Sequence, residues 1–473
     1  MAANTARSQQ LRRAGRLLGV FVCAFTCLAL LAGTRLWQAT GNNHYSHLAQ
    51  AWLSGRLDHG GTPPGFKQRR YDDWARVDTL HLRPHSQLTG PIRGSRCVRS
   101  DCRDHDRKHR TQTYRTTKGV EVAIPRRDIH KKTSSWYVTF PPAPALVMLP
   151  FVAIWGVAAW DLLLTVLLAA AIPVVLVHFF DRIRGTEDGR GRQHLWLAAA
   201  WLVASPACWV ATAGGVWFTA QIVGAFCTCM YLASAWQARA PLRAGLWLGL
   251  AVACRVTPAF GVVFFAWEWW RGGKSPRVLA RFVAPLLVIG AVLMTLNYLR
   301  FDNPLEFGHR YLDIRWQQRI QEIGMFSTAY LPRNIEAMLW LKPQITWGAT
   351  PMARWSQHGM GLLFATPWLL ALLGARTKFS GRGGLWLATM AVAIPSLLYH
   401  NTGFRQFSYR FALDYLPMLL VLLAVGGGAK RRWFAPLVVV AAAVQLYGAW
   451  LFTRAPGKLF VHDFWWPFHA LLQ

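Results

Sequence analysis

Long apolar blocks separated by polar segments dominate the pattern along the 473-residue chain. The first block covers residues 17–37 and contains one charged residue, Arg35, near its far end. Further blocks cover residues 162–180, 195–213, 216–236, 282–299, 361–375, 385–398, 415–426 and 433–452. About 20 apolar residues in a helix span the ~30 Å hydrocarbon core of a bilayer, where only internally hydrogen-bonded segments satisfy their backbone. The pattern therefore predicts an all-α polytopic membrane protein.

Two other apolar stretches do not fit a single straight crossing. Residues 141–156 contain four prolines, which favour an interfacial or re-entrant helix over a spanning one. Arg255 and Pro258 interrupt residues 245–270 near the middle, which suggests two short helices that cross as a pair. This arrangement gives about 11 transmembrane helices, with amphipathic and interfacial helices at the outer face. An arrangement in which each stretch crosses once remains open.

Basic residues indicate the orientation. Arg7, Arg12, Arg13 and Arg16 precede the first block and place the N-terminus in the cytoplasm by the positive-inside rule. The favoured arrangement also puts the short basic loops 181–193, 237–243, 271–281, 376–382 and 430–432 inside. The predicted organisation is a cytoplasmic N-terminus (1–16), a first helix (17–37), a large outer loop (38–157), transmembrane helices (158–299), a second outer loop (300–359), further transmembrane helices (360–453) and an outer C-terminal tail (454–473).

Composition narrows the class of partner. The chain carries 52 Lys and Arg against 21 Asp and Glu, a net charge of +31, yet only 15% of its residues are charged. So little charge excludes a soluble protein of this size. In a polytopic protein the basic excess lies in cytoplasmic loops and at lipid headgroups, so we expect membrane lipids and no nucleic acid as partners. No P-loop, dinucleotide fingerprint or zinc-protease motif is present, so no cofactor is indicated, although a divalent metal remains open.

The large outer loop has three distinct parts. Residues 44–58 show apolar positions at helical spacing and predict an amphipathic helix on the membrane surface. Residues 79–133 hold fourteen Lys and Arg against five Asp and Glu, without periodicity, and predict a flexible basic insertion. Cys97 and Cys102 in that insertion form a disulfide if the compartment is oxidising. Free thiols, or a metal site completed by His105 and His109, are the alternatives.

Ionisable residues collect in the segments predicted to lie outside. The first carries Asp72 and Asp73, and paired carboxylates can raise each other's pKa to suit a general base or a metal site. The second holds an acid, a histidine and an arginine at Glu306, His309 and Arg310. The third has two arginines at the start of a helix, Arg405 and Arg410, with Asp414 four residues beyond Arg410 and able to pair with it. Solvated surface charge and a structural ion pair are the corresponding alternatives.

These pieces, in this order, resemble the membrane glycosyltransferases of the GT-C fold, which include the dolichyl-phosphate-mannose protein mannosyltransferases and the bacterial aminoarabinose transferases. The similarity rests on the large outer loop after the first helix, the Pro-Pro segment Phe140-Pro141-Pro142-Ala143-Pro144, the interrupted pair after Gly245, and the stretch 406–414, which looks like a late motif of bacterial relatives. It implies transfer of a sugar from a polyprenyl-phosphate donor to an envelope glycan, lipid or protein, at the outer face of a bacterial plasma membrane.

In that family an acid just after the first helix activates the acceptor hydroxyl. Here Asn42 and Asn43 occupy the expected position. The resemblance therefore implies that another residue is the base, that His44 serves, or that the protein is a non-catalytic lipid-binding or transport protein of the envelope. The residues that it assigns are Asp73 as base, with Asp72 and Asp58 as the next candidates, and Arg405, Arg410, His309 and Arg310 for the donor phosphate.

Overall fold

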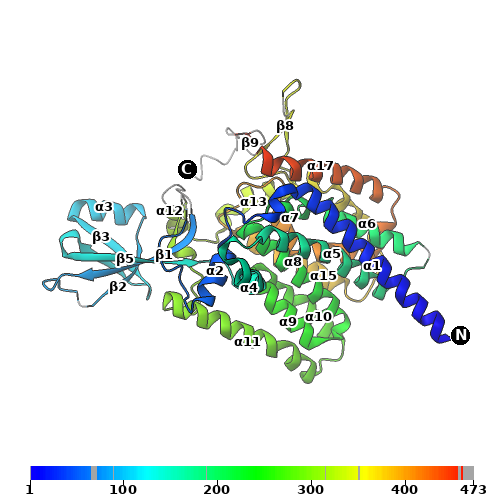
Figure 1. Ribbon diagram of the computed structural model, residues 1–473, viewed down its shortest axis with the longest axis horizontal. Helices are drawn as coiled ribbons and strands as arrows, with labels where there is room; N and C mark the ends of the chain where they lie inside the picture. Colours follow the sequence, from blue (N-terminus) through cyan, green and yellow to red (C-terminus); the bar gives the residue numbers. More distant parts are fainter. Residues whose placement is uncertain are drawn as a thin grey trace. The chain divides into compact units, whose positions relative to one another are not determined.

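The computed structural model describes residues 2–64, 72–88, 90–187, 189–314, 316–349, 352–455, 457 and 460–461 (Figure 1). The chain forms two compact units. The first comprises Met1–Asn42, Trp160–Leu286 and Thr328–Gln473, and the second comprises Asn43–Ala159 and Leu287–Ser327. Each unit is therefore assembled from segments that are distant in the sequence.

The first unit is built from helices. Its longer members are α1 (Ala2–Ala32), α5 (Asp161–Arg184), α6 (Arg190–Leu202), α8 (Val216–Ala235), α9 (Pro241–Val252), α10 (Val262–Arg271), α15 (Arg382–Leu398), α16 (Leu416–Gly426) and α17 (Phe434–Arg454). Shorter helices are α7 (Ala207–Ala213), α13 (Leu331–Leu339) and α14 (Leu362–Ala365), and small strands are β7 (Gln344–Ile345), β8 (Ala353–Ser356) and β9 (Phe460–Val461). Helix α11 (Pro276–Phe301) begins in this unit and ends in the second.

Five helices of the described chain are long and apolar enough to cross a membrane: Gln10–Trp37, Asp161–Arg184, Val216–Ala238, Pro276–Phe301 and Phe434–Arg454. The bent pair α6 and α7, with an angle of 51° between its members, would make a sixth. Helices α9, α15 and α16 are apolar but shorter than a usual span. The protein is thus a helical membrane protein, and the count of about eleven spans stays a prediction.

The core of the first unit surrounds α16. Every residue of α16 is buried, as expected of a helix that is apolar on all sides. Some buried polar groups in the same unit are paired with one another. The Trp209 indole donates to Ser408 Oγ at 3.0 Å, and Ser408 Oγ donates to Gln445 Oε1 at 3.1 Å. These bonds offset the cost of removing polar groups from water.

Helices α9 and α10 form an interrupted pair. The 3-10 helix Thr257–Gly261 lies between them, in the region where the sequence contains Arg255 and Pro258. The backbone N–H of Gln237, just before α9, donates to Glu268 Oε2 near the end of α10 at 2.9 Å. The chain therefore returns along α10 to the side from which α9 starts. The start of α9 and the end of α10 thus lie close together, and the double crossing stays a prediction.

The second unit corrects two predictions, the all-α description and the flexible basic insertion at 79–133. It contains a six-stranded sheet of order β4-β3-β2-β1-β5, with β6 beside β1. The strands are β1 (Asp72–Leu82), β2 (Ile92–Arg96), β3 (Thr111–Thr116), β4 (Glu121–Pro125), β5 (Ile129–Val138) and β6 (Leu312–Asp313), and α3 (Ser100–His109) lies between β2 and β3 in the sequence (Figure 1).

The insertion folds around a small apolar core. Leu80, Tyr114 and Ile124 are fully buried there, while Lys and Arg side chains cover the solvent side. An antiparallel sheet needs only one buried face, so few apolar residues suffice. The many basic residues hid the alternation of strands in the sequence.

Two helices precede and follow this sheet in the sequence. Helix α2 (His44–Leu53) buries His44, Tyr45, Leu48 and Ala49, which agrees with the predicted amphipathic helix, although it ends before residue 58. Helix α4 (Ala143–Trp155) is the predicted Pro-Pro helix. Its thirteen residues are fewer than a membrane span requires. A further short helix, α12 (Gln317–Ile323), completes the second unit.

Candidate functional site

Four aromatic rings from distant parts of the sequence meet in the second unit. His44 stacks on Trp74 with ring centroids 4.7 Å apart, and His47 and His59 lie 5.7 and 5.1 Å from the same indole. The rings of His47 and His59 are 5.1 Å from each other. His44 and Trp74 are buried, whereas His47 and His59 are half-buried. We call His44, His47, His59 and Trp74 the His–Trp cluster.

Local structure explains why these rings converge. His44 and His47 are three residues apart on α2, so they lie on one face of that helix. Trp74 lies on β1 opposite Val138 of β5. The backbone N–H of His59 donates to the carbonyl of Trp136, also on β5, at 2.8 Å. The amphipathic helix, the Asp-Asp-Trp segment and the strand before the Pro-Pro helix therefore build one site.

Burial favours the neutral form of two histidines in the cluster, His47 and His59. Burial, together with the neighbouring His59 and His44, lowers the pKa of His47 to about 4. Burial also lowers the pKa of His59, against the opposing effects of its ring contact with the Gly61 carbonyl and of Asp58. A neutral imidazole has a free lone pair that can accept a proton or bind a metal. The cluster can thus supply bases but little positive charge.

Two of the predicted carboxylates are adjacent in the sequence to members of the cluster. Asp58 directly precedes His59, and Asp73 directly precedes Trp74, and both carboxylate residues are half-buried. The backbone carbonyl of Asp73 accepts a hydrogen bond from Thr139 Oγ1 at 3.4 Å. The side chain of Asp72 lies outside the described residues, so its pairing with Asp73 stays a prediction. Asp58 therefore lies beside the cluster through its neighbour His59, whereas Asp73 and Trp74, consecutive on β1, present their side chains to opposite faces of the sheet.

The segment after the first helix contacts a carboxylate that sequence reasoning did not select. Asp161 is 3% exposed. Its Oδ1 accepts from the backbone N–H of Thr40 at 2.8 Å, and its Oδ2 accepts from Thr40 Oγ1 at 2.5 Å. Both oxygens thus hold the loop that leads to Asn42. The sequence did contain a signal for this residue, because Asp161 is an acid at the first position of α5 and carboxylates are favoured at helix N-termini. Asp161 therefore positions this loop.

The second group of predicted site residues, Glu306, His309 and Arg310, lies in the second unit. Glu306 Oε1 accepts from the Gly308 N–H at 2.9 Å, and Glu306 Oε2 lies 3.3 Å from Arg310 Nε. Burial lowers the pKa of His309 to about 4. His309 is therefore neutral at neutral pH and brings no positive charge to a phosphate. Part of the charge of Arg310 is offset by Glu306.

The third group of predicted site residues lies in the first unit. Its two arginines, Arg405 and Arg410, have different environments. Arg410 is 7% exposed, and its guanidinium lies over the rings of Phe218 and Phe411 and donates to Gln221 Oε1 at 3.1 Å. Arg405 is exposed, has a positive φ of 56°, and forms no side-chain hydrogen bond or ion pair with another described residue. Arg405 is thus accessible to a ligand, while Arg410 is part of the packed interior.

Asp414, predicted to pair with Arg410, has a different ion-pair partner. Its carboxylate lies 2.9 Å from Arg255 Nε and accepts from Thr257 Oγ1 at 2.6 Å. Residues 410–414 form a 3-10 helix, in which residues four apart do not align as they do in an α-helix. The pair instead joins the break between α9 and α10 to the segment before α16.

The state of Cys97 and Cys102 determines whether the insertion can form the metal site that the sequence left as an alternative. Among the described residues, one group of His, Cys, Asp and Glu has converging ligand atoms, and it comprises Cys97, Cys102 and Glu121. Cys97 and Cys102 form a disulfide with Cα atoms 6.1 Å apart. Disulfide sulfurs are not the thiolates that a metal needs. His105 and His109 are outside this group.

Comparison with known proteins indicates neither a family nor a function for this chain. The chain matches no protein-family model, no curated protein and no solved structure. The functional assignment therefore depends on the geometry of the two units.

Proposed function

We propose that the protein is a membrane glycosyltransferase that moves a sugar from a polyprenyl-phosphate donor to an envelope glycan, lipid or protein at the outer face of a bacterial plasma membrane. The supporting observation is the His–Trp cluster, with Asp58 next to His59. Aromatic rings offer apolar faces against which the C–H bonds of a sugar ring pack. The assignment of Asp73 as base comes from the sequence resemblance, and Asp58 is the alternative.

The proposed reaction is a direct displacement at the anomeric carbon. Asp73 accepts the proton of the acceptor hydroxyl as its oxygen attacks that carbon. The bond between the anomeric carbon and the donor phosphate oxygen breaks, and polyprenyl phosphate leaves with both electrons of that bond. The assignment of Arg405 to the donor phosphate rests on the sequence resemblance, on its exposure and on its planar guanidinium. No metal is required by this scheme.

Transfer of a labelled sugar tests the proposal. Purified protein in lipid nanodiscs is incubated with a panel of radiolabelled polyprenyl-phosphate sugars and candidate glycan, lipid and peptide acceptors. We expect label in one acceptor class, and its loss in the Asp58→Asn/Asp73→Asn double variant. The Asp104→Asn variant is the matched control, because Asp104 is an exposed carboxylate on α3 in the same unit. No transfer with any donor would reject the proposal.

A second candidate function, non-catalytic lipid binding, has an observation of its own. A pocket of about 400 Å³ in the first unit is lined mainly by apolar residues of α5, α8 and α9, with Arg182, Arg239 and Arg243 among its lining residues. Apolar walls with several arginines suit an anionic lipid, whose chains and headgroup need both. Native mass spectrometry would show retained lipid in the wild type and its loss when the three arginines are changed to Gln. Retained lipid without sugar transfer would favour this candidate.

A further inference from the structure

A second pocket lies on the basic insertion, within the second unit. It has a volume of about 300 Å³ and is lined by Arg96, Cys97, Val98, Arg103, Asp106, Arg107 and Arg126. Four of these seven residues are arginines, and one is an acid. Guanidinium groups that converge on a hollow are a usual arrangement for binding oxyanions, because each presents a fork of N–H donors.

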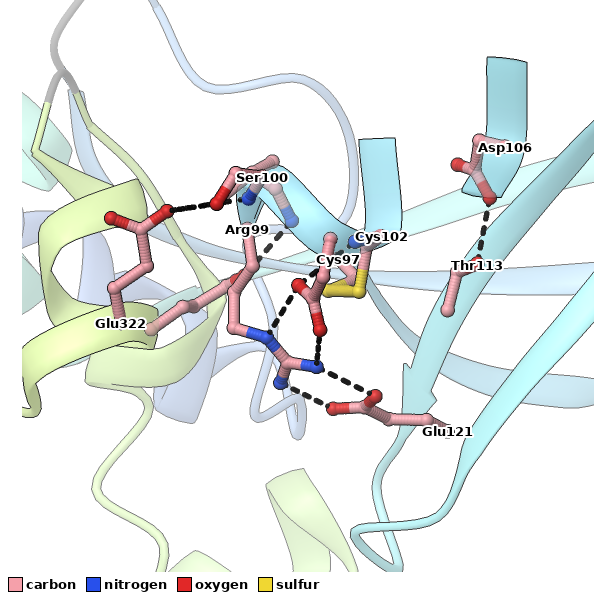
Figure 2. Close-up of polar contacts among 11 residues, drawn as sticks. Cys97, Arg99, Ser100, Cys102, Asp106, Thr113, Glu121 and Glu322 are labelled. Atoms are coloured by element: carbon pink, nitrogen blue, oxygen red, sulfur yellow. Dashed lines mark hydrogen bonds and ion pairs between the residues drawn. A yellow bond between two sulfur atoms is a disulfide. The ribbon is translucent and has the colours of Figure 1, made fainter. Parts of the chain in front are cut away.

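Within the described residues, one oxygen of the acid in this pocket is hydrogen-bonded and the other has no hydrogen-bond partner. Asp106 is 2% exposed, and its Oδ1 accepts from Thr113 Oγ1 at 2.6 Å and from Thr111 Oγ1 at 3.3 Å (Figure 2). Its Oδ2 lies 3.8 Å from a terminal nitrogen of Arg96. The lining residues therefore contain one carboxylate against four guanidiniums, and that carboxylate lies beside Arg96. Most of the positive charge is left for a ligand.

The other arginines of the pocket differ from the neighbouring Arg99 in their ion pairing. Arg99 pairs with Asp101 at 2.9 Å and with Glu121 at 2.7 Å, so its charge is neutralised within the protein (Figure 2). Arg103, Arg107 and Arg126 form no ion pair with another residue in the described ranges. The pocket therefore carries a local excess of positive charge, whereas the charge of the neighbouring Arg99 is neutralised by its acidic partners.

Covalent and hydrogen-bonded links hold the pocket in shape. The disulfide Cys97–Cys102 ties the end of β2, which carries Arg96, to α3, which carries Arg103 and Arg107 (Figure 2). Arg126 Nε donates to the Thr111 carbonyl at 3.4 Å. Arg103 and Arg107 are four residues apart on α3, where like charges repel across one turn. An anion between them would relieve that repulsion.

We propose that this pocket binds a phosphate group, either of a soluble phosphate or of a lipid headgroup. A phosphate has several acceptor oxygens in a tetrahedral arrangement, which suits several guanidinium forks better than one carboxylate does. The volume exceeds what a bare phosphate needs and leaves room for the group attached to it. Binding here requires no glycosyl transfer, so it is tested independently of the proposed function.

The test uses full-length protein in a neutral maltoside detergent, in phosphate-free buffer of constant ionic strength. Calorimetric titration with inorganic phosphate and with dihexanoyl phosphatidic acid distinguishes the two sources. Binding of both probes means that the phosphate alone is recognised. Binding of phosphatidic acid alone identifies a lipid headgroup, and binding of inorganic phosphate alone identifies a soluble ligand. Each of these results supports the proposal if the binding depends on the pocket.

Dependence on the pocket is measured with a matched pair of double variants. Arg103→Gln/Arg107→Gln should weaken binding roughly tenfold or more, since charge-assisted bonds are lost. Lys118→Gln/Lys131→Gln removes the same charge from exposed positions of the same unit outside the pocket and should leave the affinity within about twofold. Retention of the disulfide, shown by intact mass, verifies that α3 is still tied to β2.

Two results would overturn the proposal. One is an equal loss of affinity in both double variants, which would mean that only the general positive field attracts the probes. The other is the absence of binding of either probe to the wild-type protein. The charge-preserving variant Arg103→Lys/Arg107→Lys should fall between the wild type and the Gln variant, because lysine retains the charge without the fork.

Discussion

A nitrogen of the Arg16 guanidinium lies 2.9 Å from a carboxylate oxygen of Asp181, although 165 residues separate the two in the chain. Arg16 also donates to the carbonyl of Gly191 at 2.7 Å, and His194 Nδ1 lies 2.7 Å from the other oxygen of Asp181. The end of the basic N-terminal segment and the loop after α5 therefore lie together in the first unit. The positive-inside rule predicts this placement for two cytoplasmic segments.

The first prediction follows from this contact and concerns topology. We expect a single cysteine placed at Thr186, in the loop after α5, to be on the same side of the membrane as the N-terminal segment. In intact cells it should resist an impermeant maleimide, and permeabilisation should allow labelling. Labelling of Thr186→Cys from outside would instead favour the arrangement in which residues 141–156 cross the membrane.

The second prediction concerns the base. Asp73→Asn keeps the size of the side chain and removes its proton acceptor, so sugar transfer should fall by roughly 10²-fold or more. Donor binding should change little, because the donor phosphate does not depend on this group. Initial rates and equilibrium binding measured on the same preparation separate the two effects. Full turnover in well-folded Asp73→Asn would exclude it as the base, and Asp58 and His44 would be tested next.

The third prediction concerns pH. Folding lowers the pKa of His47 from 6.5 to about 4, so between these values the unfolded chain binds more protons than the folded one. The free energy of unfolding should therefore fall as the pH drops from about 6.5 toward 4, and this group should have no effect on it above that range.

Melting temperatures in detergent across that range provide the measurement. His47→Gln should show a smaller loss of stability on acidification than the wild type. His309, whose pKa is also about 4, contributes in the same range, so the His47→Gln/His309→Gln variant should be flatter still. His130→Gln changes an exposed histidine of β5 and serves as the control. Equal pH profiles for all variants would contradict the assignment.

The fourth prediction concerns the ion pair between Arg255 and Asp414. Arg255→Met leaves the carboxylate of Asp414, which is 3% exposed, without its cationic partner. Loss of one member of a buried pair costs about 3 kcal/mol or more, because the remaining charge is desolvated. Thermal unfolding should show a lower melting temperature for Arg255→Met, and a smaller decrease for Arg255→Met/Asp414→Leu.

Arg405→Ala is the control for that pair, since Arg405 is an exposed arginine of the same unit and has no side-chain partner among the described residues. Its stability should stay within about 0.5 kcal/mol of the wild type. Its donor affinity should nevertheless fall if Arg405 holds the phosphate. A melting temperature for Arg255→Met equal to that of Arg405→Ala would show that the ion pair does not stabilise the fold.

The fifth prediction concerns the disulfide. The chain has eight cysteines, six of which are free in the structure. Alkylation of the denatured, unreduced protein should therefore add six labels, and alkylation after reduction should add eight. Intact-mass measurement distinguishes these results. Eight labels before reduction would show free thiols at Cys97 and Cys102.

The sequence by itself determined that this is a helical membrane protein, that the apolar stretch after Gly245 is interrupted, and that an amphipathic helix begins at His44. These features depend on local composition and spacing. A long apolar run must be helical in lipid whatever surrounds it, and a proline or charge interrupts a helix from within.

Only the tertiary structure decided which residues meet. The sheet at residues 72–138 escaped sequence analysis because its strands contain many polar and charged residues and show no regular alternation of apolar and polar positions. The His–Trp cluster joins positions 44, 47, 59 and 74 through strand pairing, and Asp414 contacts Arg255 from 159 residues away. Side-chain spacing predicts neighbours within one helix or strand, whereas contacts between elements depend on how the whole chain packs. For that reason the sequence supplied the candidate residues, and the fold selected among them.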